Sequence, residues 1–123
     1  MAVTSQTEAW RELMAAHARV SGALDHALQA RHNLSLTEFE VLQRLVESAD
    51  GSRRMQELAD EIHLSPSALS RLVGRLERAG LAFRDVCDED RRGVYACVSD
   101  AGRSVQGEAE PTHREILAST LAG

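Results

Sequence analysis

The stretch from Met55 to Gly80, MQELADEIHLSPSALSRLVGRLERAG, decides the fold of this chain. Apolar residues recur at helical spacing before and after a short break at residues 63–65. The second run begins with Ser65, which suits a helix N-cap, and Pro66, whose missing N–H is harmless in the first turn. The run ends before Gly80, which suits the left-handed position after a helix end. Two short helices joined by so tight a turn form a helix-turn-helix.

The second of these helices carries a polar face opposite its apolar one. With about 100° between successive residues, that face comprises Ser67, Arg71, Gly74 and Arg78, flanked by Ser70 and Arg75. In a helix-turn-helix this helix places its N-terminal residues against base edges in the major groove, where arginine pairs with guanine and serine with several bases. Glycine inside a helix costs roughly 1 kcal/mol relative to alanine, so Gly74 points to the close approach of a partner. The alternative interpretation is the solvated face of an ordinary amphipathic helix.

A β-hairpin is predicted directly after this helix. The apolar runs 81–87 and 94–99 have strand character, and the polar loop between them ends in glycine. A hairpin in this place is the wing of a winged helix. Its loop carries Arg91 and Arg92, and a narrow minor groove attracts an inserted arginine. The alternative is a surface loop in which both arginines pair with the neighbouring acids.

Three segments resemble the successive signatures of the MarR family of bacterial winged-helix regulators, in particular its actinobacterial branch. They read LTEFEVLQRL, MQELADEIHLSPSALSRLVGRLERAGL and DEDRRGVYACVSDAG, and the resemblance covers about Trp10 to Pro111. It implies a homodimer that binds a near-palindromic operator, usually represses, and is relieved by small, often aromatic, ligands. It also implies a minor-groove contact at Arg91 or Arg92 and a set of major-groove residues. Ser65, the helix cap, is counted with the candidate DNA-binding residues. The major-groove set is Ser67, Ala68, Ser70, Arg71 and Arg75.

Residues 6–31 read as one long helix ahead of the DNA-binding unit. Its apolar seam repeats at heptad spacing, which is suited to packing against another helix. The seam runs Trp10, Leu13, His17, Val20, Leu24 and Ala27. So long an apolar seam is expected to be buried against another surface, and a partner subunit would supply that surface. His17 and Trp10 are candidates for a ligand pocket, although an ordinary hydrogen-bonded histidine in the interface is the alternative.

The remaining helices have recognisable boundaries. Thr37 and Glu40 predict a capping box, with Leu36 and Val41 as its hydrophobic staple, and Asp50-Gly51 predicts the end of that helix. A short third strand is expected near Arg53 and Arg54, either of which could contact phosphate.

A last helix is expected after the wing. Ser99 caps it, and Pro111 should kink or break it. Members of the family typically continue beyond the point corresponding to Gly123, into a further helix that completes the dimerisation region.

The overall charge is unusual for a protein that binds DNA. The 123 residues carry a net charge of −5, whereas DNA-binding domains are commonly basic. The segment 65–79 holds Arg71, Arg75 and Arg78 against Glu77, so positive charge is concentrated on the predicted recognition helix. We therefore expect weak non-specific binding and reliance on shape and a dimeric footprint.

Several classes of protein are disfavoured. The chain has no signal-like segment and no apolar run near 18 residues, which favours a soluble, cytoplasmic protein without membrane contact. Counting back from the hairpin loop places Cys97 opposite Arg84, so Cys87 and Cys97 are expected to be buried thiols rather than a disulfide or redox pair. The five histidines show no metal-ligand spacing, and we see no cofactor motif and no catalytic set.

The sequence thus predicts a mainly α protein, a winged helix-turn-helix with long N- and C-terminal dimerisation helices and a small β-hairpin wing. It is expected to be a single domain, 1–123, with dimerisation helices at 1–32 and 99–123 and the DNA-binding head at 36–98. The predicted function is a sequence-specific transcriptional regulator, a ligand-responsive repressor rather than an enzyme. The alternative is a winged-helix module for protein–protein interaction without DNA binding.

Overall fold

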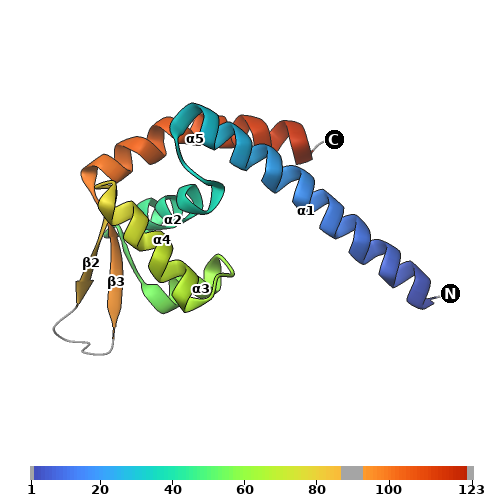
Figure 1. The fold of residues 1–123 in the computed structure, drawn as a ribbon, viewed down its shortest axis with the longest axis horizontal. Coiled ribbons are helices and arrows are strands. Elements are labelled where there is room, and N and C mark those ends of the chain that lie inside the picture. Colours follow the sequence, from blue (N-terminus) through green and yellow to red (C-terminus); the bar gives the residue numbers. More distant parts are fainter. Residues whose placement is uncertain (1, 87–92, 122–123) are drawn as a thin grey trace.

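The computed structural model describes residues 2–86 and 93–121, which form a mainly helical chain with a small antiparallel sheet. Figure 1 shows a long rod, α1, that projects well beyond the head, while α5 runs back alongside the C-terminal part of this rod. The elements in order are α1 (Ala2–His32), α2 (Leu36–Glu47), β1 (Ser52–Arg54), α3 (Met55–Glu61), α4 (Pro66–Arg78), β2 (Ala82–Val86), β3 (Val94–Val98) and α5 (Asp100–Leu121). This arrangement confirms the predicted winged helix-turn-helix.

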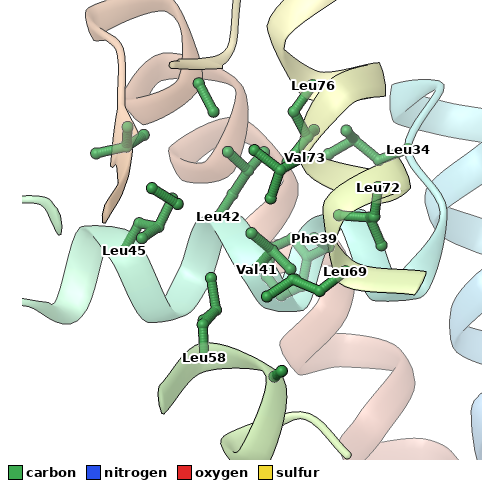
Figure 2. Packing of buried hydrophobic residues seen from close by; sticks show 14 of the residues in the cluster. Leu34, Phe39, Val41, Leu42, Leu45, Leu58, Leu69, Leu72, Val73 and Leu76 are labelled. Atoms are coloured by element: carbon green, nitrogen blue, oxygen red, sulfur yellow. The ribbon is translucent and has the colours of Figure 1, made fainter. Parts of the chain in front are cut away.

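The helix-turn-helix has the predicted boundaries. The Ser65 hydroxyl accepts a hydrogen bond from the Ala68 N–H at 3.1 Å, and Pro66 occupies the first turn of α4. His63 in the turn has φ of 60°, and Gly80, after the end of α4, has φ of 77°. The apolar face of α4 is buried against α2, as Figure 2 shows, and contributes Leu69, Leu72, Val73 and Leu76 to the core. This burial fixes which face of α4 points outward.

The predicted start of α2 is wrong by two residues. The capping box is formed by Ser35, whose hydroxyl accepts from the Glu38 N–H at 3.1 Å, while the Glu38 carboxylate accepts from the Ser35 N–H at 2.8 Å. Asp25 of α1 also accepts from the Leu36 N–H at 2.8 Å, which satisfies a further free donor of the first turn. Local sequence allowed either cap, and this contact from α1 favours the earlier one.

Two further expectations about α2 change with its boundaries. Because Ser35 is the cap, the positions of a hydrophobic staple are those of Leu34 and Phe39, both buried, rather than Leu36 and Val41. The helix also ends at Glu47 instead of Asp50. Gly51 then adopts φ of 75° in the turn that leads into β1.

The wing sheet has three strands in the order β1-β3-β2, and β1 is the expected short third strand. Its register differs by one residue from the prediction. Val86 pairs with Val94, so that Cys97 lies opposite Phe83 rather than Arg84. Cys87, Arg91 and Arg92 lie outside the described residues.

Helix α5 continues through Pro111 to Leu121, so the predicted possibility of a break is wrong. The Ser99 hydroxyl accepts from the Gly102 N–H at 3.0 Å, as expected for a cap. Ala109 and Thr112 are buried on either side of the proline, whose own side chain is exposed. Tertiary packing on both sides holds the helix together where the local hydrogen bond is lost.

The seam on α1 is covered along only part of its length. Leu24 and Ala27 are buried, and so is the neighbouring Leu28. Towards the N-terminus, Trp10 and Leu13 are 59% and 65% exposed. In a single chain the N-terminal half of α1 therefore keeps an apolar surface in solvent.

We expect the stability of the fold to fall when the pH drops below about 6.5, because of His113 in α5. Its ring stacks on Phe39 of the core at a centroid distance of 4.6 Å, and burial lowers the pKa of His113 from its ordinary value of 6.5, an effect that Glu110 only partly opposes. The unfolded chain then binds the proton first as the pH falls, so the stabilisation present above pH 6.5 is lost below it. Urea unfolding between pH 8 and 5 measures this effect. A His113→Phe variant, which keeps a ring at the stack, should lose less stability over the same range, and identical pH profiles would contradict the assignment.

Candidate nucleic-acid interface

The outward face of α4 brings together most of the predicted DNA-binding side chains. Ser67, Arg71 and Arg75 are exposed, while Ala68 and Ser70 are half-buried at the edges of the face. The opposite side of the same helix is fully occupied by the core. The head therefore presents one short, cationic and hydroxyl-bearing ridge, as a major-groove reader requires.

Arg84 of β2 belongs to this surface, although sequence reasoning did not single it out. One Nη donates to the Ser70 carbonyl oxygen at 2.6 Å and the other to the Ser70 hydroxyl at 3.3 Å. Its Nε forms an ion pair with a Glu77 carboxylate oxygen at 3.0 Å. The wing strand is thus tied to the middle of α4 through one guanidinium group. The signal in the sequence was an arginine within the first strand after the helix, but its partners depend on how β2 packs beside α4.

A shallow hollow of about 370 Å³ lies on α4 beside the base of the wing. Its lining is Ser70, Arg71, Gly74, Arg75, Arg78 and Arg84. Four arginines therefore line the hollow together with one glycine, and Glu77, the acid of this region, is engaged by Arg84. Although the whole chain has a net charge of −5, this part of its surface is distinctly positive.

The two arginines of β1 are engaged elsewhere. Arg53 forms an ion pair with Glu61 through two hydrogen bonds, which raises the pKa of Arg53. The guanidinium of Arg54 lies over the Tyr95 ring, 5.6 Å from its centroid. Neither arginine is placed on the α4 ridge.

The other candidate residues are placed as follows. Trp10 and His17 are exposed on the uncovered half of α1. Cys97 is half-buried in β3, and burial raises the pKa of its thiol, so the reactive thiolate is disfavoured. Within residues 2–86 and 93–121, no three His, Cys, Asp or Glu side chains lie close enough to share a metal ion. No described helix combines the length and apolar character needed to cross a membrane.

Comparison with known proteins gives two curated relatives, both from Bacillus subtilis (strain 168). The chain is 30% identical over 83 residues to the HTH-type transcriptional regulator MhqR, covering 68% of this chain and 56% of that protein. It is 28% identical over 92 residues to the uncharacterized HTH-type transcriptional regulator YkoM, covering 75% and 58% respectively. The chain therefore spans somewhat more than half the length of these relatives.

Solved structures share the fold over nearly the whole chain. One is Sco3205, a MarR family transcriptional regulator from Streptomyces coelicolor, in complex with DNA, with 30% identity, a TM-score of 0.87, and coverage of 95% of this chain and 73% of that one. Another is AbsC, a MarR family transcriptional regulator from the same organism, with 29% identity, a TM-score of 0.87, and coverage of 94% and 78%. The sequence model of the MarR family matches residues 32–93, which is half of the chain and includes the whole of the helix-turn-helix. Sequence and fold agree, and the chain belongs to the MarR family.

Proposed function

We propose that this chain is a sequence-specific DNA-binding transcriptional regulator, a ligand-responsive repressor that acts as a homodimer on a near-palindromic operator. The observation that carries the proposal is the outward ridge of α4, with Ser67, Arg71 and Arg75 exposed on a helix whose other face is locked in the core. The related Sco3205 has been solved in complex with DNA. On this proposal Ser65, Ser67, Ala68, Ser70, Arg71 and Arg75 approach the major groove, and Arg91 or Arg92 enters the minor groove.

The homodimer is supported by the uncovered half of α1. A side chain as large as Trp10 that is 59% exposed beside an exposed Leu13 leaves apolar surface that a second copy can bury. Leu121 at the end of α5 is also 64% exposed. A two-fold dimer through these helices would present two copies of α4 to successive major grooves, about 34–36 Å apart.

A small aromatic ligand would act by changing the distance or angle between the two heads. The proposed cleft lies between α1 and the head. A hollow of about 440 Å³ at this junction supports the position, and it is lined by Ala18, Ser21, Gly22, Asp25, Leu36 and Thr37. Trp10 and His17 remain predicted ligand-binding residues, on the part of α1 that a second copy would approach.

Selection of bound sites from a random pool of DNA duplexes tests the function, at low and moderate salt. Enrichment of a near-palindrome with half-sites one helical turn apart is the expected result. The second candidate function, a winged helix that binds another protein, is favoured by the net charge of −5. Recovery of no preferred sequence at either salt concentration would favour that candidate and would count against the regulator.

Replacing Arg71 with alanine should weaken binding to the selected site by about 1–3 kcal/mol and relax the preference at one base pair of each half-site. The reason is that Arg71 lies on the exposed ridge, in the N-terminal half of α4, where a guanidinium can pair with a guanine edge. Competition binding against duplexes carrying each single base change measures both effects. If the variant weakened every duplex equally, Arg71 would be a phosphate contact instead.

A further inference from the structure

The hollow on α4 has an open floor at Gly74. A methyl group built on this residue would lie 3.6 Å from Nη1 of Arg78 and 3.7 Å from Nη2 of Arg84, both ordinary van der Waals distances. Gly74 is also not among the described glycines with positive φ. Neither packing nor backbone conformation within the chain therefore requires glycine here, although glycine weakens a helix relative to alanine.

The two guanidinium groups beside Gly74 differ in how firmly they are held. Arg84 is fixed by Glu77 and by both acceptors of Ser70, so its position is preorganised before any partner arrives. Arg78 forms no ion pair with any other described residue, and neither do Arg71 and Arg75. The hollow thus combines the fixed guanidinium of Arg84 with three arginines that are free of ion pairs to described residues and can bind an anion.

The shape and place of the hollow select a particular part of DNA. In a helix-turn-helix the N-terminal residues of the recognition helix reach the base edges. Gly74 and Arg78 lie in the second half of α4, which would place them towards the rim of the groove when α4 docks in this way. Base edges are recessed in the groove, but backbone phosphates protrude along its rims. A concave surface that is floored by glycine and flanked by guanidinium groups fits a protruding anion, and arginine binds phosphate strongly and often through two parallel hydrogen bonds.

We propose that the hollow at Gly74 seats one backbone phosphate of the DNA in each half-site, held between Arg78 and Arg84. This inference rests on the proposed DNA-binding function and adds a fixed phosphate contact to it. Gly74 is required because a side chain there would fill the seat. Arg84 acts in addition as a positioning residue, because it holds Ser70 and the wing strand in place.

Two substitutions and a control test the seat on the selected operator. Gly74→Ala should raise the thermal midpoint of the protein yet weaken binding about tenfold, because the methyl group displaces a charge-assisted hydrogen bond. Arg78→Gln should weaken all duplexes alike and lower the slope of log affinity against log salt by about 1 for each half-site. Arg114→Gln removes the same charge from an exposed site on α5, and this variant should bind like the wild type.

Neutral methylphosphonate linkages, introduced one at a time along the operator, identify the phosphate itself. The wild type should lose about tenfold affinity at one linkage in each half-site, and the same linkage should have little further effect on Arg78→Gln. Inorganic phosphate at millimolar concentration should not reproduce the contact, because the seat is completed by the rest of the DNA surface.

The outcomes separate this inference from the function on which it rests. If the wild type binds the operator selectively, and Gly74→Ala and Arg78→Gln bind it as tightly as the wild type does, the proposed phosphate seat is wrong. The proposed function as a DNA-binding regulator is then retained. If Arg78→Gln alters the preference at one base pair without lowering the salt slope, Arg78 reads a base and the seat is again wrong. If the wild type selects no duplex, both proposals fail together.

Discussion

Replacing Gly102 with alanine is expected to destabilise the fold by more than about 3 kcal/mol. The added methyl group would overlap the carbonyl oxygen of Leu81, and it would lie 2.8 Å from Cγ2 of Val98. The first obstacle is backbone, so no side-chain rotation relieves it. The start of α5 would have to move away from the base of the wing, which would disturb the packing of the buried Val98.

Equilibrium urea unfolding measures the loss. Wild type and variant should be compared at one protein concentration, because the apparent stability of the proposed homodimer would depend on concentration. Gly107→Ala is the matched control in the same helix, since a methyl group there has no neighbour within 4 Å, and it should leave the stability unchanged or slightly raised. A Gly102→Ala variant as stable as the Gly107→Ala control would contradict the close packing of α5 on the wing.

Phe39→Ala should remove about 3–5 kcal/mol of stability, as expected when a fully buried aromatic ring leaves a cavity. Phe39 is completely buried in α2, with its ring stacked on His113 of α5. Figure 2 shows it among the leucines that α4 contributes to the core. Removal of the Phe39 ring should therefore weaken the packing of α4 on the core, and it should reduce DNA binding as well as stability.

The control for this substitution is Phe83→Ala in the wing. Its ring is 49% exposed on β2, so the same change in chemistry removes much less buried surface and should cost under about 1.5 kcal/mol. Thermal and urea unfolding of both variants give the comparison. Equal losses in the two variants would show that burial at Phe39 does not carry the stability assigned to it.

The helix-turn-helix could be predicted in detail because its signals are local. Ser65, Pro66 and Gly80 mark both ends of α4, and the apolar spacing between them is unambiguous. The wing as a hairpin after α4 was predicted for the same reason. Each of these features depends on residues close together in the chain.

The sequence-based predictions were wrong where contacts between residues far apart in the chain determine the local structure. Ser35 and Thr37 are each followed by a glutamate three residues later, so the local sequence fits either as the cap of α2, and the contact from Asp25 of α1 favours Ser35. Packing on both sides carries α5 through Pro111, although the proline weakens the helix locally. The hairpin register slipped by one residue because Val86 and Cys87 are both apolar, and the local sequence does not decide which of them pairs with Val94.

The residues of the candidate site also fall into those that local sequence predicts and those that depend on tertiary packing. The residues on α4 follow from helical geometry alone, and the structure brings them onto one ridge. Arg84 was missed because its role depends on the packing of β2 beside α4. Gly74 was singled out by helix propensity, but only the positions of Arg78 and Arg84 show that a methyl group would fit there without a clash.

A 7-deazaguanine scan of the selected operator tests whether the ridge of α4 reads base edges in the major groove. Each substitution removes one N7 acceptor from the major groove and leaves base pairing intact. The wild type should lose affinity at one guanine or more in each half-site, and Arg71→Ala should be insensitive at one of these positions. Selective binding by the wild type that no 7-deazaguanine substitution weakens, or the same sensitivity profile in Arg71→Ala, would contradict this role of the α4 ridge.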